Sequence, residues 1–109
     1  MYYHAHIFFD VSKIEEVEQL HQQLNMVLPK PIFVGRVLLK AIAPFPQPMF
    51  HIEYHESDYL QVYKALVKYC SGYSMLIHPL LPDEMAAYTE YALWLGEPLV
   101  LNLSHDESN

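Results

Sequence analysis

The sequence predicts a single α+β domain with the ferredoxin-like split βαβ arrangement, an antiparallel sheet that carries its helices on one face. Segments rich in β-branched and aromatic residues alternate with two segments of helical periodicity. Proline- and glycine-containing segments separate these units. The 109 residues, of which 52% are hydrophobic, suffice for one core and are too few for two domains. The spatial strand order expected for this arrangement is 4-1-3-2.

The first half of the chain predicts a strand, a helix and a second strand. Residues 2–9 are β-prone, and Ser12 and Glu15 have the spacing of a capping box that starts a helix. The apolar side chains that follow recur every three or four positions and form one stripe: Ile14, Val17, Leu20, Leu24 and Leu28. Residues 32–42 are apolar and rich in β-branched residues, and they predict the second strand, which a proline-rich loop ends.

The second half repeats this pattern. Residues 49–55 alternate as a third strand, and Ser57 or Asp58 is expected to cap the next helix. The apolar stripe of that helix consists of Tyr59, Val62, Tyr63, Leu66 and Cys70. Residues 73–79 predict the fourth strand, which completes the split βαβ arrangement.

The last thirty residues predict a third helix over residues 82–93, ended by Gly96. Residues 97–103 are expected to form either a short terminal strand or an extended arm. Residues 104–109 have the composition of a flexible tail, so the single domain is expected to span residues 1–103.

Composition excludes several function classes. Six Lys and Arg residues against thirteen Asp and Glu residues give a formal net charge of −7, which argues against nucleic-acid binding and favours a small neutral or cationic ligand. The longest apolar run contains Arg36 and Lys40, so no membrane segment is expected. Cys70, the single cysteine, cannot form an internal disulfide and is expected to be an inert buried thiol. With no secretory leader pattern, a cytoplasmic protein is expected.

Histidines are placed where three of the predicted strands would bring them together. Because side chains alternate along a strand, His4 and His6 share one face of the first strand. The strand order then brings His51, Glu53 and His78 onto the same face, from the two neighbouring strands.

This set suits a divalent metal or acid-base chemistry. Imidazole and carboxylate groups bind first-row metals, and three histidines, or two with Glu53, supply enough ligands. Ordinary hydrogen-bonded histidines are the alternative, and it is the expected role of His55 at its strand end. His21 and His105 are expected to be solvated. Arg36 either holds a carboxylate of a ligand or simply reaches solvent.

Three motifs carry a family resemblance. Residues 3–9 read YHAHIFF, residues 77–79 read IHP, and residues 92–96 read ALWLG, followed by PLVLNL. Together they resemble the signature blocks of the Dopa 4,5-dioxygenase family. The resemblance implies a ferredoxin-like fold, a homodimer, and a histidine-bound metal, with Fe(II) expected and Zn(II) as the alternative in purified protein. It also implies extradiol cleavage of a catechol or related phenol by O₂. His4, His6 and His78 are the implied metal ligands.

The sequence departs from the family pattern at two places. A Gly-Pro-His-Pro block reads Ala-Pro-Phe-Pro here, with Phe45 in place of histidine, and an Asp-His pair reads Ala87-Tyr88. We therefore assign Phe45 and Arg36 to substrate contact. The residues assigned to catalysis are His4, His51 and Tyr88, with His51 or Glu53 as an auxiliary metal ligand.

Three hypotheses follow. The first is a catechol-cleaving dioxygenase, and the second is a non-catalytic dimer that binds a small molecule after losing its relay histidines. The third is a face that serves only as a dimer interface and buries its histidines without metal. A homodimer is expected because helices on one side leave an apolar sheet face partly uncovered, which Leu76, Trp94 and the C-terminal arm would close across a two-fold axis.

Overall fold

The computed structural model describes residues 1–103 and shows a five-stranded antiparallel sheet in the order β2-β3-β1-β4-β5. The strands are β1 (Tyr2–Phe8), β2 (Phe33–Val34), β3 (Met49–His55), β4 (Met75–Pro79) and β5 (Leu93–Leu95). The helices are α1 (Ile14–Val27), α2 (Tyr59–Tyr69) and the short α3 (Glu84–Tyr88). The first four strands have the predicted order, so the ferredoxin-like α+β fold is confirmed. The predicted tail, with His105, lies outside the described residues.

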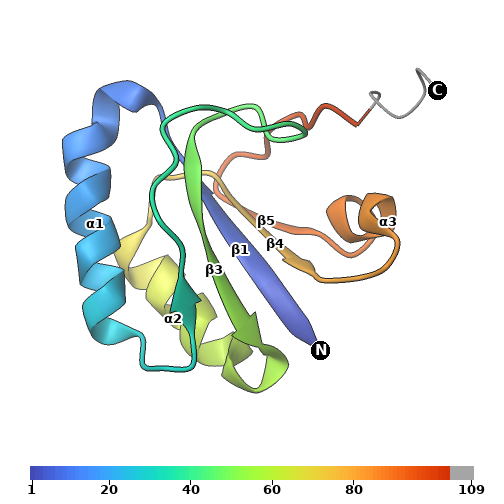
Figure 1. Ribbon diagram of the computed structural model, residues 1–109, viewed down its shortest axis with the longest axis horizontal. Helices are drawn as coiled ribbons and strands as arrows, with labels where there is room; N and C mark the ends of the chain where they lie inside the picture. Colours follow the sequence, from blue (N-terminus) through green and yellow to red (C-terminus); the bar gives the residue numbers. More distant parts are fainter. Residues whose placement is uncertain (104–109) are drawn as a thin grey trace.

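The two long helices cover one face of the sheet, while α3 lies on the opposite side (Figure 1). The main core fills the space under α1 and α2. Ala5 and Ile7 of β1 and Ile52 of β3 are fully buried there. Both predicted helix stripes face this core, because Val17 and Leu24 of the first and the corresponding residues of the second are buried in it.

A second, smaller core lies on the other face of the sheet. It consists of the buried residues Phe8, Phe45, Met49 and Leu76. Trp94 and the side chains of Leu99 and Leu101 pack against it. Leu76 is therefore buried within its own chain, which corrects the expectation that a second copy of the chain would cover it.

The second strand is much shorter than predicted. Only Phe33 and Val34 pair with β3, and the chain meets β3 again at an isolated bridge from Leu38 to Met49. Between Val34 and Leu38 lie three residues, but only two lie between their partners Ile52 and Met49. This extra residue breaks the ladder as a bulge does, and it leaves Arg36 in an exposed loop instead of a strand.

The predicted third helix, over residues 82–93, is much shorter in the structure. It ends at Tyr88, and Leu93–Leu95 instead form β5, which pairs with β4 from Ile77 to Met75. The open edge of β4 offers backbone hydrogen bonds that outweigh a weak helical pattern. Gly96 therefore follows a strand, and residues 97–103 form the extended arm, where the Asn102 N–H donates to the Pro44 carbonyl at 2.9 Å.

Two helix caps differ from the predictions. The capping side chain before α1 is Asp10 and not the predicted Ser12. Asp10 accepts a hydrogen bond from the amide of Ser12 and starts a 3₁₀ turn (Val11–Lys13) that leads into α1. Before α2, the ring of His55 accepts from the Ser57 amide at 3.2 Å and caps a 3₁₀ turn. Asp58, one of the two predicted caps, is the N-cap residue of α2, but its side chain makes no capping hydrogen bond. Within residues 1–103, no helix is long and apolar enough to cross a membrane.

Candidate functional site

The five predicted side chains form one contiguous group in the middle of the sheet, arranged in two neighbouring lines across the strands. In the strand register, His4 lies opposite His78 on one side and Glu53 on the other, and His6 lies opposite His51. Residues that face each other across antiparallel strands have neighbouring side chains. The predicted shared face is therefore confirmed, and we call these five residues the histidine row.

One half of the row is buried. His6 and His78 are each 4% exposed, and their Nε2 atoms lie 2.9 Å apart. The Nδ1–H of His78 donates to the Pro79 carbonyl at 3.0 Å, because a carbonyl can only accept. When both rings are neutral, the Nε2–H of His6 therefore donates to His78. The Nδ1 of His6 lies 3.5 Å from the sulfur of Met49.

The other half of the row reaches solvent. His4 Nε2 lies 2.8 Å from Glu53 Oε1, and the two side chains are 22% and 44% exposed. The ring of His51 is 4.6 Å from the ring of His4, measured between centroids. Exposure therefore rises along the row from His6 towards Glu53.

Burial keeps several of these imidazoles neutral. It lowers the pKa of His6 well below the ordinary value, and the neighbouring histidines lower it further. Burial is also the main cause of the lowered pKa values of His51 and His78. A neutral imidazole is the form that binds a metal, and the lowered pKa values favour this form of His6, His51 and His78 near neutral pH.

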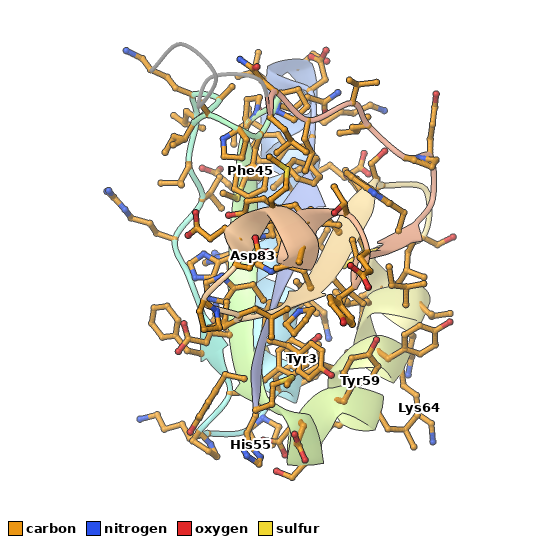
Figure 2. All side chains as sticks on the ribbon, turned by 90° about the vertical axis from the view of Figure 1, so that its right-hand side faces the viewer. Tyr3, Phe45, His55, Tyr59, Lys64 and Asp83 are labelled. Carbon is orange, nitrogen blue, oxygen red and sulfur yellow. The ribbon has the colours of Figure 1, made fainter. Side chains whose placement is uncertain are left out.

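Phe45 and Tyr88 form aromatic walls around the buried half. The Phe45 ring lies 4.4 Å from that of His6, and the Tyr88 ring meets that of His78 edge-on at 4.9 Å. Figure 2 looks onto this side and shows Phe45 beside α3, the helix that Asp83 caps. Burial raises the pKa of Tyr88, which makes its phenol a poor base.

A pocket opens at each end of the row. One, of about 200 Å³, lies between the row and α3, and its lining includes His4, His78 and Tyr88. The other, of about 440 Å³, includes His51 and Arg36. Of the two residues assigned to substrate contact, Phe45 packs on the buried His6, while Arg36 lines the pocket beside His51.

Gly35 is a site residue that the sequence analysis missed. A Cβ atom there would lie 2.9 Å from Cε1 of His51, and the Gly35 amide donates to the His51 carbonyl at 2.8 Å. His21 was expected in solvent, but it is half-buried and its Nε2–H donates to the Gly35 carbonyl at 2.7 Å. A glycine inside an apolar run was the available signal.

Cys70 lies outside the row, in the main core. It is fully buried, and burial raises the pKa of its thiol to about 12. The expectation of a buried thiol is confirmed.

The donor set fits a divalent metal. His4, His6 and His78 each offer a ligand atom, and these atoms lie within 4.8 Å of one another. Ligand histidines in proteins usually donate their second ring N–H to an acceptor that orients the ring. Here the Pro79 carbonyl is the acceptor beside His78, and the Glu53 carboxylate is the acceptor beside His4. The Met49 sulfur, a weak acceptor, lies beside His6.

Comparison with known proteins agrees with this site. The model of the Dopa 4,5-dioxygenase family matches residues 3–105. Among solved structures, the chain is similar to a protein of Nostoc punctiforme described as a "putative dioxygenase". The two share 26% sequence identity, the match covers 98% of this chain and 91% of that chain, and the TM-score is 0.87. Comparison with curated protein sequences gives no significant match. Since the family match spans nearly all of the described residues and includes the histidine row, this chain belongs to the Dopa 4,5-dioxygenase family.

Proposed function

We propose that this protein is an extradiol-type ring-cleaving dioxygenase that acts on a catecholic small molecule. The observation that carries the proposal is the convergence of His4, His6 and His78 from adjacent strands. Family membership and the similarity to another dioxygenase-like protein support it. Fe(II) is the expected metal, with Zn(II) as an alternative in purified protein. Held by these residues, the iron would supply the Lewis-acid and redox chemistry by which a catechol reacts with O₂.

The chain's own residues would bind and orient the catechol. Phe45 and Tyr88 offer aromatic surfaces beside the buried histidines, so they would hold the ring near the metal. Arg36 is exposed at the rim of the pocket near His51 and can pair with a carboxylate on the substrate. His51 is half-buried with a lowered pKa, so its neutral ring can accept the proton of a catechol hydroxyl.

A second candidate is a non-catalytic protein that binds a catechol without cleaving it. The contacts of Phe45 with His6 and of Tyr88 with His78 favour this candidate, because neither side chain relays a proton well near neutral pH. The two candidates share the metal and the ligand, and they differ only in turnover.

Metal analysis of tag-free protein tests the shared part. We expect about one Fe(II) or Zn(II) per chain, and a loss of affinity of at least ~10-fold when His6→Ala and His78→Ala are combined. His55→Ala, at the end of the same sheet face, is the matched control and should bind as the unmodified protein does. Unchanged metal affinity in the double variant would reject these ligands. The yellow semialdehyde product then separates cleavage from binding alone.

A further inference from the structure

The buried ligands have an exposed neighbour on one side. His6 and His78 are nearly inaccessible, so an ion needs a route to them. His4 lies between this buried pair and the more exposed Glu53, and it faces residues of both β3 and β4 in the register. A group that joins a buried position to a solvent-facing one is suited to transfer between them.

A second complete donor set lies on the exposed side of His4. His4, His51 and Glu53 each offer a ligand atom, and these atoms again lie within 4.8 Å of one another. Two histidines and one carboxylate are a common set for first-row divalent metals. The carboxylate adds a negative charge that the three-histidine set lacks, and the net charge of −7 attracts cations to the protein.

The backbone around His51 is shaped to keep this second set in place. Gly35 lets its loop lie directly against the His51 ring, where any Cβ atom would collide with it. Hydrogen bonds to the His51 carbonyl and from His21 hold Gly35 at that position. The pocket of about 440 Å³ that includes Gly35 and His51 gives solvent access.

We propose that His4, His51 and Glu53 form a capture position for the divalent cation, from which the ion passes to the three-histidine position by exchanging ligands around His4. A metal binds a ring nitrogen that carries no proton, so capture by His4 leaves the ring proton of a neutral imidazole on the other nitrogen. Transfer then moves the ring proton of His6 from Nε2 to Nδ1, beside the Met49 sulfur, as His4 and the two buried rings become the ligands. The inference rests on the proposed function for the final, buried position of the metal.

Loading kinetics test the capture position without any catalytic assay. Zn(II) is mixed rapidly with metal-free protein, and uptake is followed by competition with a chromophoric chelator. In His51→Ala we expect uptake at least ~10-fold slower, with the metal content reached at equilibrium unchanged. Gly35→Ala, which displaces the His51 ring without removing it, should also slow uptake. The combined variant His55→Ala with Glu56→Gln is the control and should load at the unmodified rate.

The buried pair supplies the complementary test. The variant His6→Ala with His78→Ala should still take up Zn(II) rapidly but return it to the chelator at least ~10-fold faster than the unmodified protein. Adding Glu53→Gln should abolish this uptake. Unslowed loading of His51→Ala, or no uptake by the His6/His78 variant, would overturn the capture position and leave the proposed function intact. Equally tight retention by that variant would instead reject the buried ligands of the proposed function.

Discussion

At the scale of single residues, Phe45 and Tyr88 determine what the buried histidines can do. The Phe45 ring lies tilted beside His6 and the Tyr88 ring meets His78 edge-on, so each buried imidazole has an aromatic neighbour where the family pattern has a polar one. An aromatic neighbour excludes water and can hold a catechol ring, but it does not move protons. General acid-base assistance is worth about 10²–10⁴ in rate, so metal binding and turnover should separate in this protein.

Restoring the family residues should therefore raise activity. With Phe45→His, Ala87→Asp and Tyr88→His combined, the iron-loaded protein should cleave catechols ~10²-fold faster or more, because proton relay groups return to the pocket beside His78. The semialdehyde absorbance measures the rate, and thermal unfolding checks that Asp at the buried position 87 is tolerated. Rapid cleavage by the unmodified protein would show that the two departures do not limit catalysis. No gain in the triple variant would favour the non-catalytic candidate.

The buried state of His6 predicts a pH-dependent stability of the metal-free protein. Its folded pKa lies well below the ordinary 6.5, so below pH 6.5 the unfolded chain binds a proton that the folded chain does not. Stability is retained above pH 6.5 and falls as the pH drops towards the folded pKa, by about 1.4 kcal/mol per pH unit for this group. Urea unfolding in a chelator between pH 7 and pH 5 should show this slope.

The variant His6→Gln provides the comparison for that measurement. Its amide can still donate to His78 but does not titrate, so its free energy of unfolding should fall less steeply over the same pH range. Identical slopes for the two proteins would show that His6 does not contribute to the pH dependence.

At the scale of elements, the helices and strands with strong local patterns were predicted correctly. Those whose extent depends on pairing with another strand were not. Both long helices follow from periodicity, which depends only on near neighbours. The shared face of His4, His6, His51 and His78 follows from alternation along each strand together with the strand order of the split βαβ arrangement. The short length of β2 and the strand β5 were missed because both depend on pairing with the edges of β3 and β4. Gly35 was missed because its role depends on a ring that is sixteen residues away in the sequence. Periodicity carries no information about such contacts.

Gly96 tests how strictly β5 is positioned. Its φ is +72°, and a Cβ atom would collide with the Tyr73 carbonyl next to β4. Gly96→Ala should therefore lower the free energy of unfolding by about 2–3 kcal/mol, from backbone strain and the collision together. Gly72→Ala is the matched control, since its φ is +96° but its Cβ would meet open space, and it should cost only about 1 kcal/mol. Equal losses in urea unfolding would show that the collision is relieved.

At the scale of the whole molecule, the histidine-bearing face is closed partly by its own chain. The C-terminal arm is tied to the loop at Pro44, and its side chains Leu99 and Leu101 pack over the second core. This arrangement moves the exposed apolar surface away from Leu76 and towards the loop after β2. Phe33 and Ile42 are each more than half exposed there and line the same pocket as His51.

The expected homodimer is therefore predicted to pair through the outer rim of this loop, so that the mouth of the pocket beside His51 stays open and the metal can still enter. Single exposed apolar side chains are common, but Phe33, Leu38 and Ile42 line one pocket and so form a patch, and patches of this kind mark interaction sites. Ile42→Glu would place a charge in the interface and should convert the dimer to monomer in light scattering at micromolar concentration. Met26→Glu, at an 81% exposed position on α1, is the matched control and should remain dimeric. Monomers in the unmodified protein would contradict the dimer, and dimers in both variants would move the interface away from this loop.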